Sequence, residues 1–465
     1  MQAIEKLFLV TTVSAGLSSR PRLRINWAQS AWRRGVRRFA GILGAAACLA
    51  VTVLTVHAQH TVQLPQPTGP YQIGTTSFSL VDEARSEVFT DDPNDKREIL
   101  VRCWYPAQPA AGAKPEPFWG KNTKEVGGRL AEYMRLPKTA FDDLALVRSH
   151  SFAEAPLAKS KSRFPVLIFS HGYIPGFLAQ NTVQMQELAS HGYVVFSIGH
   201  TYETVANIFP DGRAVPFSPA RFAQFAQGAG KANPLVAKYA AATDAAEKDA
   251  LLKKIPAAWP MLDESLRIWA ADVRFLMTEL EKTKSEKPKT MFAGKLDTKR
   301  IGIFGMSFGG ATAGQVCAVD NRCKAGINLD GMQSGDLIDH PMERPFMFMQ
   351  SQDAGNINRL FFDRARNDAY YIIVKGTKHF NYTDFSLLSP DYKKAGMLGS
   401  IDGDRMERIM NAYVLAFFDK YLKGKDAPLL AENSADSRRL NFLYVRRLRS
   451  GNKARVHVLD YEDYH

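Results

Sequence analysis

Cysteine is scarce in this chain, which has four among its 465 residues. Cys48 lies in an apolar run near the N-terminus, so the rest of the chain holds only Cys103, Cys317 and Cys323. An odd number excludes a framework in which every cysteine is paired. Cys317 and Cys323 are separated by five residues. They could pair in an oxidising compartment, or remain two small buried thiols.

Other signatures are missing as well. No spacing of Cys and His is typical of a zinc site, so we expect no metal. The sequence contains no internal repeat and no low-complexity tract. The formal net charge is +13, but residues 1–58 carry +7 of it, which leaves +6 for the remainder. Because no dense basic block with interleaved aromatic residues lies outside this leader, nucleic acid is not an expected partner.

The leader, residues 1–58, has the organisation of a signal peptide. A basic segment at 33–38 precedes an apolar or small stretch, Phe39 to Val56, and Val-His-Ala at 56–58 fits a cleavage site before Gln59. We therefore expect export to the periplasm or the medium. The alternative is an uncleaved anchor, because the 18 residues 39–56 are long enough to span a bilayer.

Residues 59–465 are predicted to form one α/β domain, because strand-like and helix-like segments alternate after about residue 76. Such repeats favour a mostly parallel central sheet with helices on both faces. An antiparallel pair is expected to open the domain, at Ser77–Val81 and Arg97–Trp104. Further strands are expected at 164–170, 193–197, 300–304, 325–329, 345–350 and 370–374, with helices at 180–191, 264–282 and 406–421.

Two stretches depart from this alternation. Residues 203–262 are long for a connection, are partly helical over 235–252, and are predicted to be a lid-like insertion over the binding site. Residues 426–465 form a C-terminal extension, in which 440–447 and 454–460 are predicted to make a hairpin.

The most informative motif is Gly-Met-Ser-Phe-Gly, from Gly305 to Gly309, between a buried strand and a helix. In this context Ser307 is a candidate nucleophile on a sharp turn. The two glycines are expected because a side chain at either position would collide with the neighbouring strand or helix.

A serine nucleophile needs a histidine base and an acid that orients it, and in this kind of turn they follow the serine in the order acid, then histidine. His379, just past an apolar strand, is the candidate base. His340 has no strand before it. Asp330 and Asp353 both follow predicted strands, and sequence spacing does not separate these two candidate acids.

The segment Phe-Ser-His-Gly-Tyr at 169–173 follows another strand and is a candidate oxyanion loop. Backbone N–H groups of Tyr173 and Phe308 are predicted to form the oxyanion hole. His171 is expected to brace this loop. His191 and His200 are expected to be structural, although His200 ends a strand at the same edge of the sheet.

In order along the chain, these motifs resemble the plasma-type platelet-activating factor acetylhydrolase family. They are Phe-Ser-His-Gly (169–172), Ala-Ser-His-Gly-Tyr (189–193), Gly-Met-Ser-Phe-Gly-Gly-Ala (305–311), Leu-Asp-Gly-Met (329–332) and the segment 375–385. The resemblance implies an α/β-hydrolase fold and calcium-independent cleavage of short or oxidised acyl esters at the sn-2 position of phospholipids. It selects Asp330 as the acid and leaves Asp353 as a substitute.

We therefore expect a serine-dependent carboxylic ester hydrolase that acts through an acyl-enzyme on Ser307 and needs no cofactor. Its expected partner is a small-molecule or lipid ester, with transient contact with a membrane surface. The alternatives are a broad carboxylesterase, a polyester hydrolase or a dienelactone-type hydrolase on the same fold. A non-catalytic binding protein on a hydrolase scaffold is the alternative from another functional class.

Overall fold

A computed structural model of the chain describes residues 62, 64–284, 290–388, 390–430 and 442–447. The predicted leader, with its apolar stretch 39–56, and the predicted strand 454–460 lie outside these ranges. Within them, no helix combines the length and the apolar character that crossing a membrane requires.

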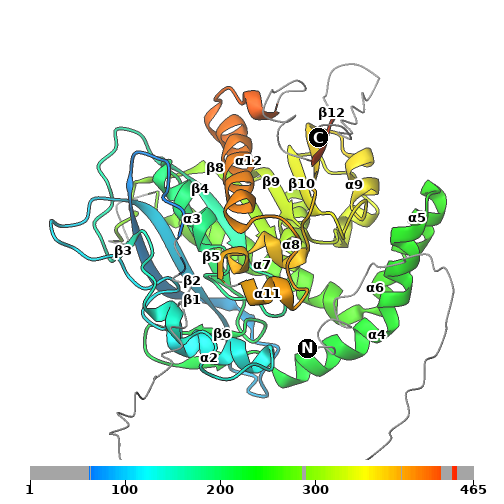
Figure 1. The fold of residues 1–465 in the computed structure, drawn as a ribbon, viewed down its shortest axis with the longest axis horizontal. Helices are drawn as coiled ribbons and strands as arrows, with labels where there is room; N and C mark the ends of the chain where they lie inside the picture. The colour runs from blue at the N-terminus through cyan, green and yellow to red at the C-terminus, as the bar shows by residue number, and fades with distance from the viewer. Residues whose placement is uncertain (1–61, 63, 285–289, 389, 431–441, 448–465) are drawn as a thin grey trace, which may run out of the picture. The chain divides into compact units, whose positions relative to one another are not determined.

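A ten-stranded sheet runs through the molecule in the order β12-β11-β10-β9-β8-β4-β5-β2-β1-β3 (Figure 1). Its strands are β1 (Gln72–Ser86), β2 (Lys96–Ala107), β3 (Ser151–Ala153), β4 (Phe164–Ser170), β5 (Val194–Gly199), β8 (Leu296–Met306), β9 (Cys323–Leu329), β10 (Phe346–Ser351), β11 (Ala369–Val374) and β12 (Phe442–Arg447). From β11 to β5 neighbouring strands are parallel. The carboxyl ends of these strands therefore meet at one edge of the sheet, where ligands bind in such folds.

The predicted mostly parallel sheet is confirmed, and so is the antiparallel pair that opens the domain, which is β1 with β2. At the opposite end, β12 adds an antiparallel edge strand to β11. The first strand of the predicted C-terminal hairpin is thus present, but among the described residues its partner is β11.

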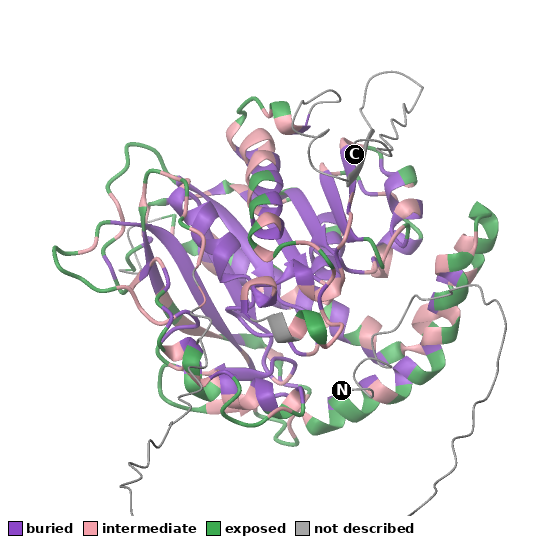
Figure 2. Cartoon of the chain, in the orientation of Figure 1, coloured by how far each residue is buried: buried purple, intermediate pink, exposed green. Residues whose placement is uncertain are grey.

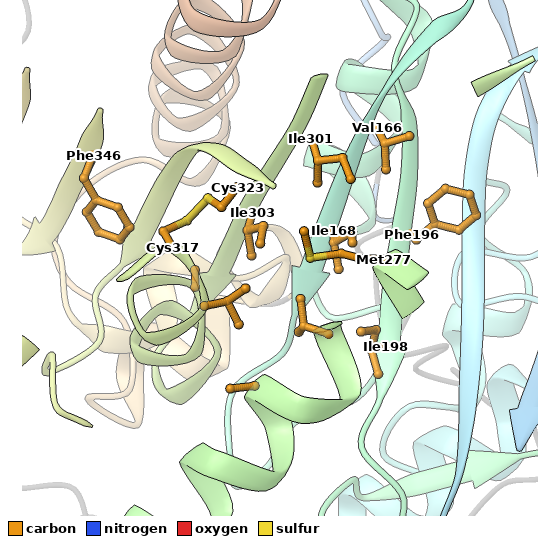
Figure 3. Close-up of a cluster of buried hydrophobic side chains, with 14 of the residues drawn as sticks. Val166, Ile168, Phe196, Ile198, Met277, Ile301, Ile303, Cys317, Cys323 and Phe346 are labelled. Carbon is orange, nitrogen blue, oxygen red and sulfur yellow. A yellow bond between two sulfur atoms is a disulfide. The ribbon is translucent and has the colours of Figure 1, made fainter. Parts of the chain in front are cut away.

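Helices cover both faces of the sheet. One face carries α7 (Pro260–Lys282), α8 (Phe308–Val319) and α9 (Arg359–Arg364), and the other carries α3 (Thr182–Ser190) and α12 (Gly403–Lys423). Successive residues of β4 alternate between two cores, with Val166 and Ile168 in the first and Leu167 and Phe169 in the second. Figure 3 shows part of the first core, which lies on the face covered by α7 and α8. Figure 2 shows that buried residues concentrate in the central sheet. The remaining α-helices among the described residues are α2 (Thr123–Tyr133), α4 (Pro219–Ala241), α5 (Ala245–Leu252), α6 (Ile255–Ala258), α10 (Phe385–Leu388) and α11 (Pro390–Lys394).

A disulfide joins Cys317, near the end of α8, to Cys323, the first residue of β9 (Figure 3). Both cysteines lie in the first core, beside Phe346. Of the two outcomes left open by the sequence, the structure has the paired one. Cys103 remains a buried thiol, and burial raises its pKa well above the usual value.

The insertion begins with a two-stranded sheet of β6 (Ala206–Ile208) and β7 (Ala214–Pro216) and continues through α4, α5 and α6. The side chain of Ser218 accepts a hydrogen bond at the start of α4, and that of Asp244 does so at the start of α5. The helix predicted over 235–252 is therefore two helices, because the chain leaves helical geometry at Ala242 before Asp244 caps the next one.

The turn between β8 and α8 is closely packed against the end of β4. Ser307 has a φ of 56°, a backbone conformation that non-glycine residues adopt rarely. A Cβ atom on Gly305 would lie 2.2 Å from the backbone carbon of Gly309, and one on Gly309 would lie 1.9 Å from the carbonyl oxygen of Ser170. Both glycines are therefore required by the close approach of backbone to backbone.

Gly309→Ala is expected to lower the free energy of unfolding by about 3 kcal/mol or more, because a backbone atom and not a flexible side chain occupies the space. Gly230→Ala is the matched control, since Gly230 lies in α4 with nothing within 4 Å of an added Cβ. We expect this control to be up to about 1 kcal/mol more stable than the wild type. Urea denaturation of both variants measures the difference, and equal stabilities would refute the steric explanation.

Candidate active site

Three residues far apart in the sequence meet at the carboxyl edge of the sheet. Ser307 stands on the turn after β8, Asp330 directly follows β9, and His379 begins a short 3-10 helix, His379–Tyr382, after β11. His379 Nε2 is 3.0 Å from the Oγ of Ser307, and its Nδ1 is 2.7 Å from Oδ2 of Asp330. The structure thus brings together the predicted nucleophile, acid and base in one continuous chain of hydrogen bonds.

The side chains of His379 and Asp330 differ in exposure. The Asp330 side chain is 1% exposed and that of His379 is 30% exposed, and both residues line a cavity. Asp330 is held from two sides, because its backbone N–H donates to the carbonyl of Met349 and its Oδ1 accepts a 2.6 Å hydrogen bond from the N–H of Ser351. A buried, fixed carboxylate can orient an imidazole and favour its charged form.

Asp353, the other candidate acid, has a different environment. It is exposed and lies in the lining of the same cavity. Burial of part of the side chain raises its pKa, the positive charge of Lys378 opposes this, and the negative charge of Asp330 adds to it. The short hydrogen bond from Nδ1 of His379 goes to Asp330.

Tyr173 and Phe308, the predicted oxyanion residues, lie beside Ser307. Phe308 is the first residue of α8, where backbone N–H groups have no partner within the helix and the helix dipole is positive. Tyr173 follows Gly172 in the loop after β4. Tyr173 and Gly172 line a small recess together with Ser307 and His379. The rings of Tyr173 and Phe308 meet edge to face, with centroids 5.2 Å apart.

Of the three other histidines considered above, His171 and His200 are buried beside the site and His191 is partly exposed. His171 bonds the carbonyl of Gly172 and the hydroxyl of Thr204, and burial lowers its pKa to about 3, so it stays neutral. This agrees with the predicted bracing of the loop. His200 bonds Asp272 and Ser170 and is fully buried outside the cavity lining. His191 bonds Glu187.

A cavity of about 690 Å³ has Ser307 and His379 in its lining. Most of the lining is apolar, and the insertion supplies a large part of it. Its contribution consists of Phe222, Phe225, Asn233, Val236, Leu252, Ile255, Pro256, Trp259 and Leu262. The lid-like insertion therefore forms one wall of the space beside the candidate nucleophile.

Sequence reasoning missed a buried carboxylate, Glu203, at the start of this insertion. It accepts hydrogen bonds from Tyr173, Arg221, Ser265 and Trp269. No local pattern marks Glu203, because three of these donors lie 18 to 66 residues further along the chain. In the described part of the chain, no group of three or more His, Cys, Asp or Glu side chains is arranged to hold a metal ion.

The chain is similar to known esterases in sequence and in structure. It is 25% identical over 384 residues to the platelet-activating factor acetylhydrolase of Cavia porcellus, covering 78% of each chain. It is 24% identical over 394 residues to that of Gallus gallus, covering 79% of this chain and 86% of the relative. A solved ferulic acid esterase from Streptomyces cinnamoneus superimposes with a TM-score of 0.61 and 23% identity, over 80% of this chain and 96% of that one.

The superposition identifies the fold as that of an α/β-hydrolase, as predicted. The family described as platelet-activating factor acetylhydrolase, isoform II, matches residues 56–209 and 283–437. The stretch between them, 210–282, holds most of the insertion and α7. The matched segments make up more than half of the chain and contain all three hydrogen-bonded residues of the site. The chain is therefore a carboxylic ester hydrolase and belongs to the platelet-activating factor acetylhydrolase isoform II family.

Proposed function

We propose that the chain hydrolyses esters through an acyl-enzyme on Ser307, and that its substrates are phospholipid-like esters with short or oxidised acyl groups. The observation that carries this proposal is the pair of hydrogen bonds that link Ser307 to His379 and His379 to Asp330. They give a serine hydroxyl the base that it needs to act as a nucleophile.

In the proposed first half-reaction, Nε2 of His379 takes the proton of Ser307 as its Oγ attacks the ester carbonyl carbon. Asp330 accepts the hydrogen bond of Nδ1–H and stabilises the imidazolium. When the tetrahedral intermediate collapses, the bond to the leaving oxygen breaks, and His379 donates the proton to the departing alcohol. Water then attacks the acyl-enzyme with the same base and releases the carboxylic acid and free Ser307.

The negative charge of the tetrahedral intermediate needs donors that are already in place. The backbone N–H groups of Tyr173 and Phe308 are proposed as these donors, because both residues border Ser307 and one begins a helix. Removal of one such donor typically lowers kcat by about 10²–10³.

The substrate class is supported by the family and by the cavity. The relatives named above are platelet-activating factor acetylhydrolases. A mostly apolar cavity of about 690 Å³ suits the hydrocarbon part of a lipid ester.

We also propose that the protein is exported. The disulfide between Cys317 and Cys323 supports this, because such bonds persist in oxidising compartments. Mass spectrometry of the secreted or periplasmic protein is expected to find Gln59 at its N-terminus. Protein that retains residues 39–56 and fractionates with membranes would favour the anchor instead.

Asp330→Asn is expected to lower kcat by about 10⁴, because the amide would favour the wrong tautomer of His379. Asp353→Asn is the matched control and is expected to keep most of the activity, since Asp353 is exposed at the cavity wall. Ser307→Ala sets the background, with a loss of about 10⁴–10⁶ in kcat. Equal losses in the two aspartate variants, both folded by circular dichroism, would assign the acid role differently.

Ile255→Trp is expected to narrow the cavity and to lower kcat/KM for long or bulky acyl esters at least about tenfold relative to an acetate ester. Ala257→Trp is the control, because Ala257 is exposed on the same short helix and is not part of the lining. A panel of short-chain esters, long-chain lipids and oxidised phospholipids measures the change. Identical preferences in both variants and the wild type would make the insertion a peripheral element.

A further inference from the structure

We infer that Glu203 is a positioning residue that fixes the oxyanion hole and ties the insertion to it. The inference rests on the proposed function, since it assumes that the N–H groups of Tyr173 and Phe308 bind the oxyanion. It adds a residue outside the hydrogen-bonded triad that sets the rate of the chemical step.

Glu203 is a fully buried carboxylate with four donors directed at it. Its Oε1 accepts hydrogen bonds from the hydroxyl of Tyr173 at 2.7 Å, from Ser265 at 2.6 Å and from Nε of Arg221 at 2.9 Å. Its Oε2 accepts one from the indole N–H of Trp269 at 2.7 Å. A buried carboxylate is tolerated only when it is paired and hydrogen-bonded. Movement of any of these four donors would leave the buried carboxylate with fewer hydrogen bonds, so the donors are fixed in position together with it.

Two of these donors, Tyr173 and Trp269, have rings that contact each other and Phe308, so they pack around the proposed oxyanion residues. The ring of Tyr173 stacks on those of Phe225 and Trp269, with centroids 5.1 and 5.8 Å away. Trp269 and Tyr173 both meet the ring of Phe308 edge to face, at 4.9 and 5.2 Å. Glu203 thus accepts hydrogen bonds from both residues whose rings contact Phe308, and one of them is Tyr173.

The other donors connect this cluster to the insertion. Arg221 is in the first turn of α4, and its guanidinium also bonds Ser265 and the carbonyl of Met261 at the start of α7. Burial opposes the charge of Arg221, but Glu203 and the other partners outweigh this and raise the pKa of the guanidinium, which stays charged. The N-terminal turn of α4 and the loop that contains Tyr173 are therefore bonded to the same carboxylate, that of Glu203.

This arrangement has a consequence for catalysis. A small displacement of a positioned group can lower a rate by about 10²-fold without loss of binding. Loss of a donor to Glu203 should let the Tyr173 loop relax while the cavity still accepts the ester. The effect should appear in kcat and in the affinity for transition-state analogues, and not in KM.

The test compares Glu203→Gln and Tyr173→Phe with Glu264→Gln. Glu264 is the matched control, because it also pairs with Arg221, at 2.7 Å, but its side chain is 56% exposed. For an acetate ester, Glu203→Gln is expected to lower kcat by about 10- to 100-fold and Tyr173→Phe by about tenfold, with KM changed less than about threefold. The double variant should lose little more than Glu203→Gln alone. Glu264→Gln should match the wild type.

A trifluoromethyl ketone that adds to Ser307 provides a second readout. Its inhibition constant should rise by the same factor as kcat falls, whereas the pH dependence of kcat should keep its shape, because the contacts of His379 are unchanged. Wild-type kcat and inhibitor affinity in Tyr173→Phe, which leaves three donors on Glu203, would overturn the inference even if Glu203→Gln does not fold. Activity that survives in Ser307→Ala would instead overturn the proposed function.

Discussion

At the turn between β8 and α8 the backbone comes so close to the end of β4 that no side chain fits at Gly305 or Gly309. The same approach holds Ser307 at a φ of 56°, a conformation that costs about 1–3 kcal/mol and persists only where surrounding structure enforces it. Because the turn packs directly against the end of β4, three elements have fixed mutual positions. They are the turn with Ser307, the start of α8 and the loop after β4. The proposed nucleophile and both proposed oxyanion donors lie on these three elements.

Asp330 and His379 join that arrangement through the parallel sheet. Each follows a strand on the same side of β8, so both emerge at the carboxyl edge beside Ser307. Asp330 also adopts a positive φ, of 55°, and its backbone and carboxylate are bonded to β10 and the residue that ends it. The sheet therefore places the proposed base, His379, whose exposed side remains open to the cavity.

The part of the chain that the family match omits forms one wall of the cavity beside Ser307. The family match skips residues 210–282, and this stretch supplies the wall of the cavity formed by α4 to α6. Glu203 and Tyr173 lie inside the matched part, whereas Arg221, Ser265 and Trp269 lie in the skipped part. The wall that shapes the substrate site and the loop proposed to stabilise the intermediate thus share one buried carboxylate.

Features that arise from local sterics and periodicity could be predicted from the sequence. The apolar runs gave β4, β8 and β9, and the two glycines marked Ser307, because these constraints act between residues close in the chain. Sequence spacing did not separate Asp330 from Asp353, since both follow strands that end at the same edge. The resemblance to the family favoured Asp330, and folding then brings its carboxylate to within 2.7 Å of Nδ1 of His379, across 49 residues. The proposed role of Glu203 is not visible in the sequence either, because folding brings three of its four donors from segments 18 to 66 residues further along the chain.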